Sequence, residues 1–88
     1  MKLIRNATAG TLESSDIMVS IMPAEQINIE VESVVGGIFG DAIYDCINKK
    51  LGEMGVQGAK VFVNDKGALD CVICARIEAA VLRAAKEE

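Results

Sequence analysis

Two short segments in the first third of the chain alternate apolar and other residues with a period of two. The apolar members are Ile17, Val19 and Ile21 in one segment and Ile27, Ile29 and Val31 in the other. This period is typical of β-strands with one buried face. Pro23 ends the first segment, because proline cannot donate to a strand ladder. Since only Ala24–Gln26 separates the two segments, we expect an antiparallel hairpin.

The pattern then changes to the three-to-four residue spacing of an amphipathic helix. The residues of this apolar stripe are Phe39, Ala42, Ile43, Cys46, Ile47, Leu51 and Met54. Gly52 and Gly55 mark the end of the helix. Gly55 suits the position just past a helix, where the backbone often takes a left-handed conformation.

A third strand and a second helix are predicted in the last third of the chain. The strand, at about Lys60–Asn64, is β-branched around Phe62, and Asn64–Gly67 has the composition of a turn. We expect Asn64 or Asp65 to cap the helix that follows. The apolar stripe of that helix is Leu69, Val72, Ile73, Arg76 or Ile77, Ala80, Val81 and Ala84.

The predicted order of elements is therefore β-β-α-β-α within a single domain, residues 1–88. Residues 1–15 are small and polar, so we expect a loop or an irregular edge segment there. Half-buried strands that alternate with helices favour an α+β fold. We expect a small antiparallel or mixed sheet of three to four strands, with both helices packed on one face.

Composition narrows the classes of function. The 88-residue chain carries 13 acidic and 9 basic residues, a net charge of −4, which disfavours a nucleic-acid partner. It has no apolar run of the roughly 18 residues that a membrane span needs. The start, M-K-L-I-R-N, lacks the long apolar segment of a secretory signal. We therefore expect a cytoplasmic protein with no membrane partner.

The chain contains no histidine, so it lacks the most common general base and metal ligand. A Ser-His-Asp or Cys-His arrangement cannot be built within it. Three cysteines, Cys46, Cys71 and Cys74, are an odd number and are expected to be reduced thiols in the cytoplasm. These features predict a non-catalytic domain rather than a complete enzyme.

Three motifs suggest other chemistry, and each favours a structural interpretation. Gly36–Gly40 precedes a helix but lacks the residues of a phosphate-binding loop or dinucleotide fingerprint. Cys71 and Cys74 form a C-x-x-C pair, but aliphatic residues lie between them and no histidine completes a zinc site. Lys66 lies at a turn, as the modified lysine of lipoyl and biotinyl domains does, but those domains are all-β and this turn precedes a helix.

The segment Thr11–Asp16 (T-L-E-S-S-D) reads as an exposed loop before a strand. No histidine activates either of its serines as a nucleophile. A serine that another enzyme modifies needs only exposure, which a loop provides. The acidic Glu13 and Asp16 either steer basic partner sites toward the loop or, for Asp16, hold the turn through its side chain.

Three ordered motifs resemble one family over nearly the whole chain. The segment Ala9–Asp16 (A-G-T-L-E-S-S-D) is similar to the N-terminal motif of the citrate lyase acyl carrier proteins, the gamma subunits of that complex. Phe39–Asp41 matches the F-G-D before the first helix of that family. Asp65–Cys71 (D-K-G-A-L-D-C), followed by Ala75 and Arg76, resembles its C-terminal segment.

The resemblance implies a carrier function. It implies a covalent group related to coenzyme A, 2′-(5″-triphosphoribosyl)-3′-dephospho-coenzyme A, joined through a phosphodiester to Ser14. Ser15 occupies a position where the family also accepts glycine. The implied partners are the citrate lyase alpha and beta subunits, a prosthetic-group transferase and an acetylating ligase. The alpha subunit exchanges acetyl for citryl on the thiol of the group, and the beta subunit releases oxaloacetate.

The resemblance does not extend to the fold of ordinary acyl carrier proteins, which are four-helix bundles. Two alternatives stay open on the residues alone. The chain is similar to the carrier of malonate decarboxylase, which uses a related prosthetic group. It could also be a plain protein-interaction module in which the Ser14 loop is only a turn.

Overall fold

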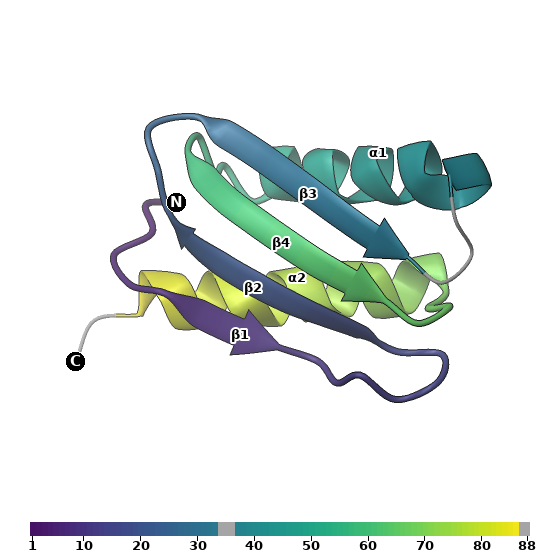
Figure 1. The fold of residues 1–88 in the computed structure, drawn as a ribbon. Coiled ribbons are helices and arrows are strands. Elements are labelled where there is room, and N and C mark those ends of the chain that lie inside the picture. Colours follow the sequence, from purple (N-terminus) through teal and green to yellow (C-terminus); the bar gives the residue numbers. More distant parts are fainter. Residues whose placement is uncertain (34–36, 87–88) are drawn as a thin grey trace.

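The computed structural model of the chain describes residues 1–33 and 37–86, and for 37–40 the backbone alone. Four strands and two helices follow one another along it (Figure 1). They are β1 (Ala7–Ala9), β2 (Ile17–Pro23), β3 (Ile27–Ser33), α1 (Gly37–Glu53), β4 (Ala59–Asp65) and α2 (Asp70–Ala85). The fold is α+β, as predicted.

The sheet is mixed, with strand order β1-β2-β4-β3. Strand β4 lies between β2 and β3, antiparallel to β2 and parallel to β3. The expected hairpin of β2 with β3 is therefore wrong. Helix α1 provides the crossover that a parallel pair requires and returns the chain to the gap between the two strands. Strand β3, helix α1 and strand β4 thus form a β-α-β unit whose two strands are direct neighbours, with β2 on the other side of β4 and β1 at the far edge.

Glycine at position 58 allows the link between β2 and β3 to cross the start of β4. A Cβ atom at Gly58 would lie only 2.0 Å from the carbonyl oxygen of Ala24. The amide of Ala59 donates to the carbonyl of Gln26 at 3.1 Å, which holds the link against β4. A connection as short as Ala24–Gln26 thus spans a strand instead of turning back beside its own.

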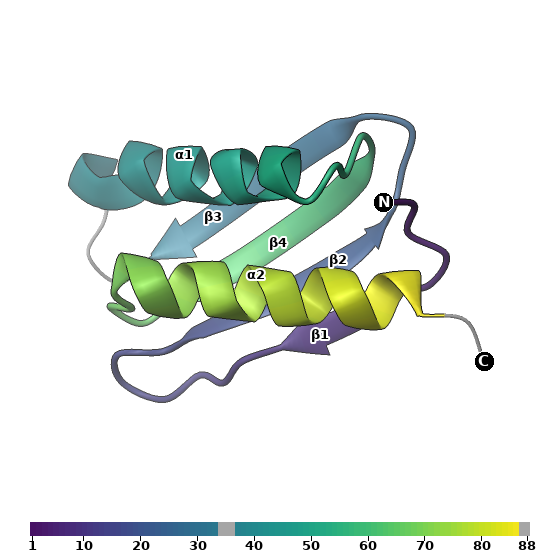
Figure 2. The same ribbon diagram turned by 180° about the vertical axis from the view of Figure 1, so that it is seen from behind.

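Both helices cover one face of the sheet, as predicted (Figure 2). The core lies between these two layers and consists of aliphatic residues. Its largest fully buried apolar side chains are Ile17, Val19, Ile21, Ile47, Leu51, Val61, Val63, Ile73, Ile77 and Val81. The opposite face carries Met22 and Phe62, which are about 40 % exposed. No helix within the described residues is long and apolar enough to cross a membrane.

The helix boundaries agree with the sequence pattern at one end and differ at another. Helix α1 ends as predicted, because Gly55 has a φ of +70° and its amide bonds to the carbonyl of Gly52. Helix α2 begins at Asp70, so Leu69 is its N-cap and not part of its apolar stripe. Leu69 is 71 % exposed, which contradicts its predicted place in the core. The side chain of Phe39 lies outside the described residues, and Ala42 is exposed.

Residues 1–15 include a regular strand that the sequence pattern did not predict. Ala7–Ala9 pairs antiparallel with the middle of β2, with Thr8 opposite Ser20. Three residues are too few for a period of two to show. The amides of Ile4 and Arg5 both donate to the carbonyl of Ala84, so the segment is also fastened to the end of α2.

Candidate functional site

The two adjacent serines form the tip of a tight turn between β1 and β2. The amide of Asp16 donates to the carbonyl of Glu13 at 3.2 Å and closes a four-residue β-turn. Ser15, the third residue, has a φ of +65°, as in a type II turn, where glycine or asparagine is usual. Ser14, the second residue, is exposed. The turn therefore presents the Ser14 side chain to solvent.

Lys66 fastens this turn to the end of β4. The amide of Ser15 donates to the carbonyl of Lys66 at 2.8 Å, and the amide of Lys66 donates to the carbonyl of Asp16 at 2.9 Å. Two residues of one strand thus oppose one residue of its neighbour, with the first in a left-handed conformation. This is the pattern of a G1 β-bulge, in which glycine normally holds the position of Ser15. The glycine that the resemblance allows there has a conformational reason.

The Asp16 carboxylate holds the base of the turn. The Arg76 guanidinium donates to both of its oxygens, from Nε to Oδ1 at 3.0 Å and from Nη2 to Oδ2 at 2.9 Å. The Thr11 hydroxyl donates to Oδ2 at 2.7 Å, and the amide of Ile17 donates to Oδ1 at 2.7 Å. Asp16 therefore receives four hydrogen bonds that connect the loop, β2 and α2.

Electrostatics strengthen this contact. The hydrogen bonds from Arg76, then those from Thr11 and Ile17, hold the pKa of Asp16 well below its ordinary value of 3.8. The same pairing raises the pKa of Arg76. Of the two roles considered for Asp16, holding the turn is the one that its geometry shows. The exposed Glu13 makes no such contact through its carboxylate within the described residues.

The importance of Arg76 could not be read from the periodicity, which left either Arg76 or Ile77 on the buried stripe. Ile77 is buried, while Arg76 lies at the edge of the stripe with 40 % of its side chain exposed. A lone cation beside an apolar stripe was the available signal. Gly10 lies beside the Arg76 side chain, and a Cβ at this position would clash with the Ile17 carbonyl.

A second carboxylate holds the neighbouring turn. Asp65 is only 1 % exposed, and it accepts from the Ser33 hydroxyl and from the amide of Ala68, both at 2.9 Å. The expected helix cap is therefore a clamp on the turn before the helix. The N-cap residue of α2, Leu69, offers no side-chain hydrogen bond.

The cysteines do not form the C-x-x-C arrangement of a redox or zinc site. Cys74 faces Cys46 across the two helices, with a sulfur-to-sulfur distance of 3.5 Å, while Cys71 is exposed. Burial, and then the contact with Cys74, raise the pKa of Cys46 to about 11, which keeps this thiol protonated. Within residues 1–33 and 37–86 no cluster of three potential metal ligands exists.

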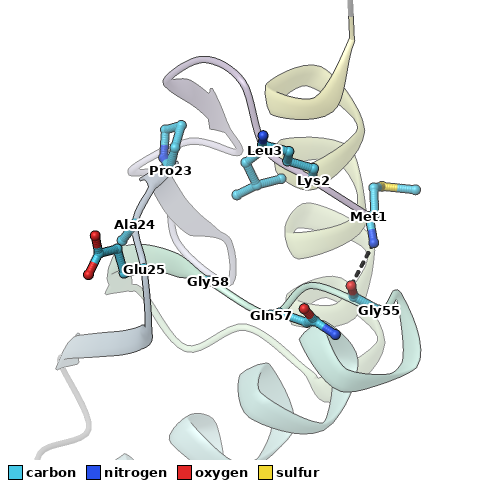
Figure 3. Close-up of a pocket in the computed structure, with 9 residues that line it drawn as sticks. All are labelled: Met1, Lys2, Leu3, Pro23, Ala24, Glu25, Gly55, Gln57 and Gly58. Atoms are coloured by element: carbon cyan, nitrogen blue, oxygen red, sulfur yellow. Dashed lines mark hydrogen bonds between the residues drawn. The ribbon is translucent and has the colours of Figure 1, made fainter.

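A cavity of about 650 Å³ lies at the other end of the sheet (Figure 3). It is lined by Pro23 at the end of β2, by Gly58 before β4, and by Met1, whose ammonium group donates to the Gly55 carbonyl at 2.6 Å. Ser14 lies before the start of β2, and Lys66 follows the end of β4. The cavity and the serine turn therefore lie at opposite ends of the paired strands β2 and β4, one strand length apart.

Comparison with known proteins identifies the class of protein to which this chain belongs. Residues 4–84 match the acyl carrier family model described as "Malonate decarboxylase delta subunit (MdcD)". The fold resembles a chain in the crystal structure of a Pseudomonas malonate decarboxylase hetero-tetramer in complex with malonate. The TM-score is 0.74 at 20 % identity, covering 96 % of this chain and 92 % of that one. The family model thus places this chain among acyl carrier subunits, and the structural match shows that the two chains share a fold.

The curated relatives identify the family more specifically than the family model does. The chain is 49 % identical to the citrate lyase acyl carrier protein of Escherichia fergusonii and 51 % identical to that of Klebsiella pneumoniae. Each alignment covers 99 % of this chain and 92 % of the relative. The chain therefore belongs to the family of citrate lyase acyl carrier proteins. The predicted resemblance is confirmed, and so is the exclusion of a four-helix fold.

Proposed function

We propose that this protein is the acyl carrier subunit of a citrate lyase complex and that Ser14 is the attachment site of its prosthetic group. The observation that carries the proposal is the position of Ser14. It is an exposed residue at the tip of a turn whose base is fastened to β4 by two backbone hydrogen bonds and to α2 by the Asp16–Arg76 pair. The turn is thus held at its base, while the Ser14 side chain is accessible.

The residues around Ser14 fit a phosphodiester. Within the described part of the chain, the Ser14 hydroxyl makes no hydrogen bond that modification would break. The nearby negative charge of Asp16 is already paired with Arg76. Lys66 lies opposite the bulge, where its backbone bonds to Ser15 and Asp16. Its ammonium group has no ion-pair partner among the described residues, so it can approach a phosphate. By contrast, the backbone of Ser15 is part of the bulge, and its left-handed conformation is unfavourable for any residue with a side chain.

The proposed group is derived from 2′-(5″-triphosphoribosyl)-3′-dephospho-coenzyme A. When bound, it supplies a thiol that carries acetyl or citryl as a thioester. The phosphodiester to serine keeps one of the three phosphates in the triphosphate of the precursor. In the attachment step, the Ser14 Oγ therefore attacks the phosphorus of this triphosphate that is bonded to the ribose oxygen, and diphosphate leaves. The serine proton passes to a base of the transferase, since this chain contains no histidine.

The proposed division of labour follows from the same chemistry. The chain presents and tethers the thioester, which raises its effective concentration at each partner site. Acyl exchange and carbon–carbon bond cleavage belong to the alpha and beta subunits, and a separate ligase acetylates the thiol. Within this proposal, no side chain of the carrier forms or breaks a substrate bond.

Intact mass measurement tests the attachment site. Protein produced together with the transferase and the enzymes that make the precursor should gain one mass increment, equal to the precursor less diphosphate. Ser14→Ala should abolish this gain, whereas Ser15→Ala and Lys66→Ala should retain it. A modification that survives Ser14→Ala would overturn the assignment. One that is lost only in Lys66→Ala would instead favour a lipoyl-like lysine.

The malonate decarboxylase likeness supports a second candidate, a carrier for that complex. Loaded protein should restore citrate cleavage to carrier-depleted citrate lyase alpha and beta subunits, and it should not restore malonate decarboxylation to the corresponding depleted complex. The reverse result would favour the second candidate while leaving Ser14 as the anchor.

A further inference from the structure

Two leucines at the Ser14 end of the molecule are exposed in a way that stability does not explain. Leu12 lies two residues before Ser14 and is 57 % exposed. Leu69 is 71 % exposed, three residues after Lys66, whose backbone is bonded to the serine turn. The loop before β2 and the turn after β4 lie at the same end of the sheet (Figure 1). We call these two side chains the Leu12–Leu69 surface.

Leu69 also breaks a local rule. It is the N-cap residue of α2 and provides no side-chain hydrogen bond to the open amides of the first turn. Serine, threonine, aspartate and asparagine are preferred at this position because they do provide one, and leucine is among the poorest choices. Leu69 neither caps the helix nor packs in the core, which indicates that this residue has a role other than stabilising the fold.

The attachment reaction requires direct contact at this end. For a phosphodiester to form, Ser14 Oγ must come within bonding distance of phosphorus inside the active site of the transferase. Residues that border the turn are then buried against that enzyme. The lyase subunits act on a thioester at the far end of a long arm, so their chemistry does not require contact with the turn.

On the basis of the proposed function, we propose that the Leu12–Leu69 surface binds the transferase that attaches the prosthetic group to Ser14. The partner surface is an apolar depression beside its active site, which takes the two leucine side chains. An aliphatic side chain that enters a pocket and is surrounded by a polar rim can act as the anchor of an interface.

The test uses Leu69→Ser, because this change separates recognition from folding. A serine N-cap should raise the melting temperature of the carrier. The rate of mass gain with purified transferase and precursor should nevertheless fall, with KM for the carrier rising about tenfold, as expected for the loss of one apolar anchor. Leu12→Ser should act in the same direction. Leu82→Ser is the matched control, since Leu82 is 50 % exposed on α2, more than three helical turns from Leu69.

The outcomes separate the two proposals. An unchanged KM in Leu69→Ser and Leu12→Ser, or an equal rise in Leu82→Ser, would overturn the transferase surface while leaving Ser14 as the anchor. Variants loaded to completion with excess transferase should support citrate cleavage at the wild-type rate. A loss of cleavage by the loaded variants would overturn the assignment by showing that the lyase subunits bind these leucines. Continued modification of Ser14→Ala would instead remove the proposed function itself.

Discussion

Two aspartates hold the two loops at the Ser14 end, and they do so by different means. Asp16 is an ion-paired carboxylate at the edge of the molecule, bound by Arg76 and by the loop that it organises. Asp65 is buried, and its partners are neutral: the hydroxyl of Ser33 and the amide of Ala68. Asp16 fastens an exposed loop to helix α2 at the edge of the core. Asp65 is part of the core and connects the ends of β3 and β4.

This difference predicts separate consequences of losing each carboxylate. Removal of a buried acceptor leaves donors without compensation in a place that water does not reach, which destabilises the whole domain. Removal of a partly exposed ion pair mainly frees the loop, because exposed ion pairs contribute little to global stability. The core should therefore depend on Asp65, and presentation of the serine should depend on Asp16.

The largest effect is expected for Asp65→Ala. It removes the acceptor of the Ala68 amide and of the Ser33 hydroxyl and leaves a small void, so the free energy of unfolding should fall by about 2–3 kcal/mol. Denaturant titration measures this. Asp65→Asn, which keeps one carbonyl oxygen of the same shape, is the control and should cost less. Equal losses for Asp65→Ala and Asp16→Ala would contradict the distinction between the two loops.

A smaller, pH-dependent effect is expected for Asp16→Asn. Since the pKa of Asp16 is lower in the folded protein than its ordinary value of 3.8, the ionised carboxylate favours the folded state above that value. The stability difference between wild type and Asp16→Asn should be constant at neutral pH and shrink as the pH falls below about 4. Chemical denaturation from pH 7 to pH 2.5 tests this. A difference that grows in acid would refute the pairing.

The same variant should have a local effect that Asp65→Asn lacks. With the Arg76 pair weakened, the turn should open more often, and amide hydrogen exchange at Ser15 and Asp16 should speed up while the β4 amides stay protected. Arg76→Met provides a second route to the same state, because it keeps much of the length of the side chain without the charge. Uniform loss of protection across the sheet would show that Asp16 belongs to the core after all.

The smallest effect is expected for Ser15→Gly. Its φ of +65° is costly for any residue with a Cβ atom, so glycine should stabilise the folded turn. Part of the gain is offset by the greater freedom of glycine in the unfolded chain. A net increase of about 0.5–1 kcal/mol in the free energy of unfolding is expected, with unchanged modification of Ser14. Ser15→Val should move stability the opposite way, and a stabilising valine would disprove the strained turn.

The periodicity of the chain was sufficient for five of the six elements and for the layered α+β class. Alternation in β2 and β3 and the three-to-four spacing in both helices each report local burial, which depends on near neighbours in sequence. The end of α1 at Gly55 was equally local. The short strand β1 contained too few residues to show a period, and Leu69 was assigned to the core because spacing alone cannot tell a last loop residue from a first helical one.

The hydrophobic periodicity does not determine which strands pair with one another in the sheet. Whether β2 meets β3 or β4 depends on how the crossover through α1 packs, and on Gly58 allowing the link Ala24–Gln26 to pass over β4. The same holds for the candidate site. The motif resemblance singled out Ser14, but the bond of Asp16 to Arg76 joins residues 60 positions apart in the chain.

The sequence by itself determined that this chain folds into half-buried strands and amphipathic helices, that it contains no histidine, and which serine the resemblance points to. Only the tertiary structure decided how the two serines differ in conformation. The bulge opposite Lys66 gives Ser15 a left-handed backbone, whereas both serine side chains are exposed at the tip of the turn. Local patterns record burial, whereas the orientation of a loop is set by contacts between segments that are distant in sequence.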